Sequence, residues 1–204
     1  MARLKSNGIA KPEAVSPIKS MKDIKKIKQY LIGKANKRDY MLFVVGINIG
    51  LRCGDLLKLK ISDVMNADKT FKETVTVEEE KTSKTRTFKL NASAKESIEL
   101  YLNSLKNYDF NDYLFKSRKG DDHLRVDSVH KLIKTTLREL GIKGNFGTHS
   151  LRKTWAYYTY TNNSNNPRIL NVLQKALNHS SEAVTLRYIG IEQEEILDLY
   201  DNNL

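Results

Sequence analysis

Four residues in the last third of the chain have side chains suited to chemistry on a phosphate. His149 and Arg152 are three positions apart, so on a helix they lie one turn from each other on the same side. There an imidazole and a guanidinium can bind a single anion. An isolated His179 follows, and Tyr188 stands nine positions after it. Such a set is what phosphoryl transfer through a covalent tyrosine requires, because it combines a nucleophile with groups that stabilise negative charge.

An arginine earlier in the chain stands in an unusual place. Arg52 directly follows a strongly apolar segment, where a charge is costly unless it is paired or binds a ligand. Asp55, three residues later, is the expected ion-pair partner that would hold the guanidinium in place.

The composition favours a polyanionic partner. Lys and Arg outnumber Asp and Glu by 35 to 24, which gives a formal net charge of +11, and nucleic acid is the commonest partner of such proteins. The alternative is a basic protein whose charges only solvate its surface. The single Cys53 excludes an intramolecular disulfide and a Cys-rich metal site.

The elements that must position these residues are mostly helices. Apolar periodicity and capping residues predict helices that begin at Ser20, Lys37, Asp55, Ser93, Val126, Thr148, Pro167 and Ser181. Ser20, Ser93 and Thr148 are expected to act as N-caps, and Gly50 is expected to end its helix in the left-handed conformation. Two β-branched or alternating runs, 74–77 and 85–88, predict a hairpin. The expected fold class is therefore mainly α with a small antiparallel β-sheet (α+β).

The two ends of the chain differ from the middle. Residues 1–19 are expected to form a basic, flexible arm, and residues 20–204 a single domain. Five acidic residues follow Ile191, and Ile196, Leu197 and Tyr200 give this tail an apolar seam. Neither a signal peptide nor an apolar run long enough to span a membrane is recognisable. We therefore expect a cytoplasmic protein that does not interact with membranes.

Six positions in order resemble the tyrosine recombinase (phage integrase) family from about Ser20 to Tyr200. Gly50-Leu51-Arg52-Cys53-Gly54-Asp55 is similar to the first arginine box of that family, and Lys81-Thr82-Ser83-Lys84 to its hairpin lysine segment. His149-Ser150-Leu151-Arg152 matches the second box. Leu177-Asn178-His179, leading to Arg187-Tyr188, matches the third, although glycine is more frequent where Asn178 stands. The resemblance implies the DNA breaking-rejoining fold of a catalytic integrase-type domain.

The resemblance also implies a role for each residue. Tyr188 is the nucleophile that becomes joined to a 3′ phosphate, and Arg52 and Arg152 bind the non-bridging oxygens. His149 is a general base or hydrogen-bond donor, and His179 is a further phosphate contact. Lys81 protonates the leaving 5′ oxygen, with Lys84 as the alternative hairpin lysine. No metal ion, ATP or other cofactor is implied, because cations of the chain carry the charge stabilisation and the phosphotyrosine conserves the energy of the broken bond.

The implied partner is double-stranded DNA, bound by a homo-oligomer that is a tetramer on DNA. The resemblance further implies a site-specific recombinase encoded by a bacterium or a phage. Most family members carry an additional N-terminal core-binding domain, which we expect to be absent here. Two other functions stay open: a DNA-binding regulator that keeps the fold without exchanging strands, and a relaxing enzyme similar to type IB topoisomerases.

Overall fold

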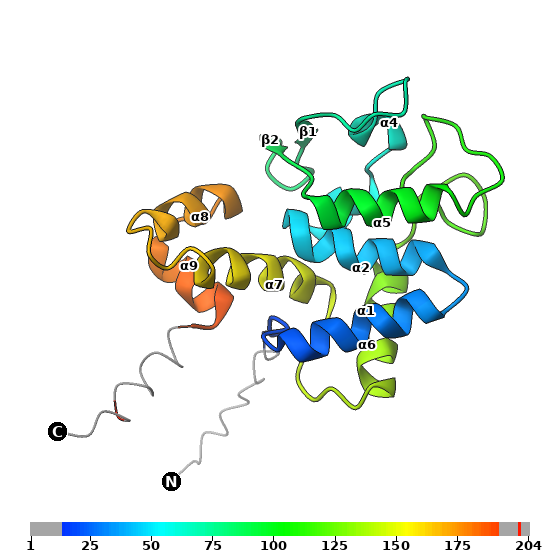
Figure 1. Ribbon diagram of the computed structural model, residues 1–204. Helices are drawn as coiled ribbons and strands as arrows, with labels where there is room; N and C mark the ends of the chain where they lie inside the picture. The colour runs from blue at the N-terminus through cyan, green and yellow to red at the C-terminus, as the bar shows by residue number, and fades with distance from the viewer. Residues whose placement is uncertain (1–13, 192–199, 201–204) are drawn as a thin grey trace, which may run out of the picture.

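The structure is a computed structural model that describes residues 14–191 and Tyr200. It is built mainly from helices and contains one two-stranded antiparallel sheet (Figure 1), as the sequence predicts. The elements in order are α1 (Met21–Gly33), α2 (Lys37–Ile49), α3 (Cys53–Leu57), α4 (Ile61–Val64), β1 (Val75–Glu78), β2 (Thr85–Phe88), α5 (Ala92–Leu102), α6 (Val126–Glu139), α7 (Thr148–Thr161), α8 (Ile169–Leu177) and α9 (Glu182–Ile189). None of the helices in the described part of the chain is both long and apolar enough to cross a membrane.

Helix α2 lies at the centre of the molecule, between α1, α5 and α7. Its apolar residues occur on all sides, and Met41, Leu42 and Val45 are fully buried, which is typical of a helix surrounded by other elements. At Gly46 a Cβ atom would lie 2.7 Å from Leu151 Cδ1. The absence of a side chain there allows α7 to approach α2 closely, and α7 carries two of the candidate site residues.

The hairpin forms as predicted, with the first strand shifted by one residue from 74–77 to Val75–Glu78 and the second at Thr85–Phe88. Val75 pairs with Phe88 and Glu78 with Thr85 in antiparallel register. Side chains alternate between the two faces of a strand, so Val75, Val77 and the next residue in this series, Glu79, point towards the interior. On β2 the same alternation turns Arg86 inward.

Of the three N-cap residues predicted from the sequence, one is confirmed. The Ser20 side chain accepts a hydrogen bond from Asp23 N and begins α1, as expected. The predicted cap of α5 is wrong, since Asn91 rather than Ser93 accepts the bond from Ala94 N. The predicted cap of α7 is also wrong. Thr148 is already helical, and the hydroxyl of Ser150 accepts a bond from Gly147 N at 3.0 Å instead.

The segment that precedes α1 packs along α7. Ile18 is 2% exposed, and its backbone N–H donates to Thr154 Oγ1 at 2.8 Å. The hydroxyl of Tyr158 donates to the carbonyl of Lys19 at 2.6 Å. The described end of the expected arm is therefore ordered against the domain, and residues 1–13 lie outside the described part. Ile196 and Leu197 of the expected apolar seam also lie outside it, whereas Tyr200 is exposed.

Buried apolar residues form two clusters that α7 connects. The large core is built around α1, α2, α3 and α5 and includes Leu151 of α7. The small core consists of Ala156 of α7 with Leu173, Leu177, Ile189 and Ile191, which belong to or follow α8 and α9. In Figure 1, α7 runs from the body of the molecule towards α8 and α9. Helix α7 thus contributes Leu151 and Tyr158 to the large core and Ala156 to the small one.

Candidate active site

Arg52 is placed by the abrupt end of α2. Gly50 adopts a left-handed conformation with φ 62°, as predicted, and the chain turns there so that Arg52 becomes the residue before α3. The Arg52 side chain is 22% exposed, and its Nη1 lies 2.5 Å from Glu79 Oε2. The guanidinium is therefore held from the protein side and is still accessible from solvent.

Asp55 is more distant from Arg52 than the sequence suggests. Its Oδ2 lies 4.0 Å from Arg52 Nη1 and has no hydrogen-bond partner among the described residues. The other oxygen, Oδ1, accepts a bond from the backbone N–H of Glu80 at 3.0 Å. Asp55 consequently fastens the hairpin to α3, and the close ion pair of Arg52 is with Glu79.

Arg152 is buried where α7, the end of α2 and the end of α8 meet. Its two terminal nitrogens donate to the carbonyls of Gly50 and Leu177, each at 2.9 Å. These carbonyls end helices α2 and α8, and the ends of helices leave carbonyl groups without partners inside the helix. Arg152 satisfies one at each end and thereby fixes the position of its own guanidinium.

Arg86 places a third, partly buried guanidinium beside Arg52 and Arg152, at a position that the sequence did not predict. It donates to the carbonyls of Gly50 and Ile49 at 3.0 and 3.2 Å, and it stacks on Trp155 with 5.4 Å between the guanidinium carbon and the ring centre. Burial, together with the nearby charge of Arg152, lowers the pKa of Arg86 to about 10. Arg86 therefore adds a third positive charge close to Arg52 and Arg152.

His149 lies in the first turn of α7 and remains exposed as a residue. Its pKa is lowered, first by burial of the imidazole and then by Arg152 and Lys153. A neutral imidazole among these cations is suited to accept a proton at neutral pH.

His179 and Tyr188 are brought together by the turn between α8 and α9. Asn178 ends α8 in the left-handed conformation at φ 57°, which explains why a glycine is usual there and why Asn is tolerated. The rings of His179 and Tyr188 then meet edge to face with 4.8 Å between their centres. On its other side, His179 Nδ1 lies 3.1 Å from Thr185 Oγ1, which fixes the ring orientation.

The Tyr188 hydroxyl is buried and forms no hydrogen bond with any described residue. Burial raises the pKa of this phenol, and the charges of Arg152 and then Arg52 partly oppose that effect. Arg152 lies close enough to lower the pKa of the phenol through its charge and by hydrogen bonding, although the geometry between the two groups is not that of a well-directed bond. The ammonium of Lys153 lies 4.9 Å from the centre of the phenol ring. A buried phenol beside guanidinium groups is poised to attack an anion that those groups bind.

The hairpin places its two lysines differently. Lys81 lies in the turn between β1 and β2, is exposed, and forms no hydrogen bond or ion pair within the described residues. Lys84 reaches across to the turn before α9, where its Nζ donates to Asn178 Oδ1 at 2.9 Å. Lys81 is therefore free to meet a ligand, and Lys84 already has a partner beside His179.

The structure brings Arg52, Arg152 and His179 around the buried phenol of Tyr188, and His149 lies near the same arginines. Mutual electrostatic effects connect Arg52, Arg152, His149, His179 and Tyr188, and Lys81 stands at the rim on the hairpin. Across residues 14–191 and 200, no three His, Cys, Asp or Glu side chains converge as metal ligands would.

Two residues that face the site, the buried Glu79 and the partly buried Arg86, were missed in the sequence. The signal that could have found them is the period of two along each strand. Glu79 continues the inward series of Val75 and Val77, and Arg86 shares its face with Phe88. Lys153 was missed as well, and it carries no comparable signal, because a lysine after Arg152 is most simply read as solvent-exposed.

Several known proteins are similar to this chain in sequence. The model of the phage integrase family matches residues 19–195. A protein of Bacillus subtilis (strain 168) named "Probable integrase/recombinase YoeC" is 38% identical over 180 residues, which cover 88% of this chain and 92% of that protein. The tyrosine recombinase XerC of Caldanaerobacter subterraneus subsp. tengcongensis is 27% identical over 187 residues, 90% of this chain and 50% of the relative.

Solved structures show the same fold. The crystal structure of XerA recombinase superposes with a TM-score of 0.69 at 23% identity, covering 100% of this chain and 70% of that one. XerH site-specific recombinase bound to a palindromic difH substrate gives 0.68 at 21% identity, covering 96% and 56%. The chain thus spans nearly the whole of the Bacillus relative and about half of the XerC and XerH chains.

Proposed function

This chain belongs to the phage integrase family, and on that premise we propose that it is a site-specific recombinase. It cleaves and rejoins double-stranded DNA through a phosphotyrosine on Tyr188. The observation that supports this most directly is the Tyr188 hydroxyl, which is buried without a hydrogen-bond partner beside Arg152. A buried phenol that lacks a partner is costly for stability alone, and it is explained if the missing partner is the DNA phosphate.

The cleavage step follows from the placement of the groups. Tyr188 Oη forms a bond to phosphorus, the bond to the 5′ oxygen breaks, and the product is a 3′ phosphotyrosine with a free 5′ hydroxyl. His149 takes the phenol proton, and Lys81 gives a proton to the leaving oxygen. Arg52 and Arg152 stabilise the charge that builds up on the non-bridging oxygens, as preorganised donors do in other phosphoryl transfers. His179 keeps the Tyr188 ring in place and contacts the phosphate.

Rejoining is the same step in reverse. One phosphoester bond replaces another, so the phosphotyrosine keeps the energy of the broken strand and no nucleotide cofactor is required. The cations of the chain supply the stabilisation that a metal ion supplies in other enzymes. We therefore propose a reaction independent of ATP and of metal ions.

Duplex DNA is the proposed partner. XerH was solved bound to a difH substrate, and a lambda integrase dimer was solved bound to a core site. In this chain, α6 lies next to the site, because a Cβ atom added at Gly147 would come within 3.3 Å of the His130 ring. The outer face of α6 exposes Lys131, Lys134 and Arg138, which can contact phosphates along the duplex.

We further propose that the protein acts as a homo-oligomer on DNA. Exchange between two duplexes breaks four strands, and each chain offers one nucleophile at this site. Four copies are therefore needed for one complete exchange, which makes a tetramer the functional assembly.

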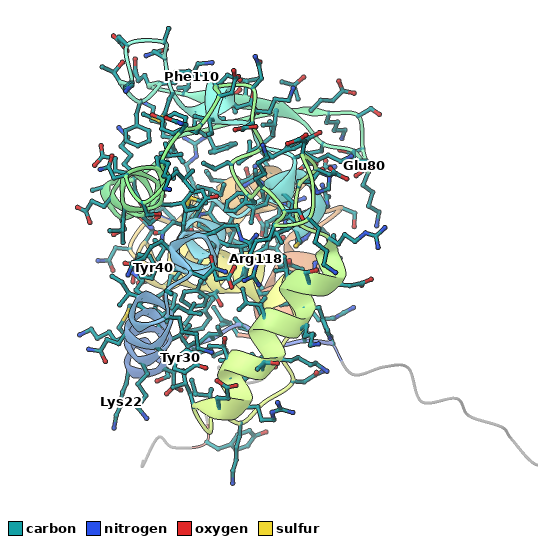
Figure 2. The ribbon with its side chains drawn as sticks, turned by 90° about the vertical axis from the view of Figure 1, so that its right-hand side faces the viewer. Lys22, Tyr30, Tyr40, Glu80, Phe110 and Arg118 are labelled. Carbon is teal, nitrogen blue, oxygen red and sulfur yellow. The ribbon has the colours of Figure 1, made fainter. Side chains whose placement is uncertain are left out.

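The test is a covalent adduct. The protein is incubated with nicked duplexes made from the DNA that flanks its own reading frame, and the products are separated under denaturing conditions. Wild type and the control Tyr30→Phe, on α1 and far from Glu80 of the hairpin (Figure 2), should form an adduct. Tyr188→Phe should form none while binding the duplex equally well. Duplex binding by the wild type without any adduct would favour a DNA-binding regulator. Relaxation of plasmids that lack a specific site would favour a topoisomerase-like enzyme.

A further inference from the structure

Glu79 is a buried acid at the centre of the arginine cluster. The residue is 3% exposed, and its Oε2 lies 2.5 Å from Arg52 Nη1. The same oxygen accepts a hydrogen bond from Thr82 Oγ1 at 2.9 Å. The carboxylate is thus fixed from two directions, by the arginine and by the hairpin turn.

The second carboxylate oxygen faces the other two guanidinium groups. Glu79 Oε1 lies 3.7 Å from Arg86 Nη1 and 3.8 Å from Arg152 Nη1. Three cations this close repel one another, and the repulsion is strong where water is excluded. One carboxylate between them offsets part of this repulsion, so the arginines can lie side by side before any phosphate arrives.

The ionisation of Glu79 is consistent with this environment. Burial on its own raises the pKa of the carboxyl, but the interactions with Arg52 and Thr82 outweigh it, and the pKa lies below its ordinary value. The carboxylate therefore stays charged at neutral pH.

The backbone of Glu79 also builds the turn that holds Lys81. Its N–H donates to the carbonyl of Lys84 at 2.9 Å, and its own carbonyl accepts from Ser83 N at 2.8 Å. From the opposite side, Asp55 Oδ1 accepts a bond from Glu80 N. Two contacts therefore join the hairpin to the segment after α2. In one, Glu79 of the hairpin pairs with Arg52, and in the other Asp55 accepts from the backbone of the hairpin.

We propose that Glu79 is a positioning residue for strand cleavage, whose carboxylate sets the Arg52 guanidinium beside Arg152 and holds the Lys81 turn in register with this pair. The inference rests on the proposed function, since it assigns Glu79 a part in the same site. It makes Glu79 act through Arg52 rather than on the DNA. Its loss should affect the transition state, where the arginines bear the most charge, more than the binding of duplex.

The experiment compares Glu79→Gln with Glu80→Gln, the same chemical change one residue along the chain. Glu80 is exposed at the edge of the molecule (Figure 2) and pairs with Lys58 at 3.0 Å. Single-turnover cleavage by Glu79→Gln should be slower by about 100-fold, the effect of a displacement of about 1 Å in a catalytic group. Its half-saturating duplex concentration should stay within about threefold of wild type. Glu80→Gln should match wild type, and Glu79→Asp, which keeps the charge, should recover part of the rate.

A purely structural role for Glu79 gives a different pattern. In that case Glu79→Gln would weaken duplex binding and cleavage together and lower the thermal midpoint, and Glu79→Asp would not restore the rate. That pattern, or a Glu79→Gln variant that cleaves at the wild-type rate, would overturn the proposal.

A second measurement does not depend on cleavage. The NMR signals of the arginine Nε–Hε groups report the order of Arg52 and Arg152 in the DNA-free protein. We expect sharp, resolved signals in wild type and Glu80→Gln, and shifted, broadened signals in Glu79→Gln. Unchanged signals in Glu79→Gln would refute the positioning role, whether or not the wild type forms an adduct. A wild type that forms no adduct would instead count against the proposed function.

Discussion

Lys84 donates a hydrogen bond from its Nζ to Asn178 Oδ1 across 94 positions of sequence, at 2.9 Å. This bond joins the hairpin to the turn that precedes α9, and so to His179 and Tyr188. Lys84 is thereby engaged in holding the site together, while the neighbouring Lys81 has no partner among the described residues. The two lysines should therefore respond differently to substitution.

Lys81→Ala should lose the proton donor for the leaving oxygen. Cleavage of an ordinary duplex should fall by about 100-fold or more, the usual contribution of a general acid. A duplex with sulfur in place of the bridging 5′ oxygen should restore the rate, because a thiolate leaves without being protonated. Lys84→Ala is the matched control, and sulfur should not accelerate it beyond wild type. If the sulfur-containing duplex restored cleavage by Lys84→Ala and not by Lys81→Ala, Lys84 would be the proton donor for the leaving oxygen.

Gly50→Ala should destabilise the protein strongly. Gly50 has φ 62°, and a Cβ atom there would lie 2.1 Å from Trp155 Cε3. The left-handed conformation costs about 1–2 kcal/mol for a residue with a side chain, and overpacking adds about 1–3 kcal/mol. Gly141 has φ 65° with open space around it, so Gly141→Ala should show the first cost alone. Urea unfolding of both variants measures the difference, and equal losses would rule out the clash with Trp155.

Acidification should destabilise the fold through His149 and His179. The pKa values of His149 and His179 lie below the ordinary 6.5, so the unfolded chain takes up protons at a higher pH than the folded protein. The free energy of unfolding should then fall as the pH drops through about 6.5 towards the lowered values. Urea midpoints between pH 7.5 and 5.5 test this. The double variant His149→Gln, His179→Gln should show a flatter dependence, and a midpoint that rises on acidification would contradict the prediction.

Much of the fold could be predicted from the sequence because its signals are local. Ser20, Gly50 and the two β-branched strands are short-range features, and each was confirmed in the structure. The caps of α5 and α7 were predicted wrongly for a physical reason. At α5 the chain enters the helix two residues earlier than Ser93, so Asn91 accepts from Ala94 N, and at α7 the hydroxyl of Ser150 accepts from Gly147 N.

The candidate site could be predicted only in part. Arg152, Arg52 and His179 lie near the Tyr188 phenol, whereas the catalytic roles of all the predicted positions stay predictions. The partner of Arg52 could not be found from spacing, because Asp55 is near in sequence whereas Glu79 becomes near only when the hairpin folds over α3. Arg86 likewise reaches the carbonyl of Gly50 through tertiary structure alone. Interactions between segments distant in sequence decide these contacts.

The interior is divided into two cores, and the site residues that rest on them are expected to differ in local stability. Arg52 and the hairpin rest on the large core, whereas Tyr188 packs against the small core of α7, α8 and α9. A segment secured by fewer buried contacts opens at a lower free energy than the whole protein unfolds. Amide hydrogens in α8 and α9 should accordingly exchange with solvent sooner than those in α2. In such an opening the nucleophile Tyr188 and the Leu177 carbonyl that holds Arg152 separate from the site, while Arg52 and the hairpin stay folded on the large core.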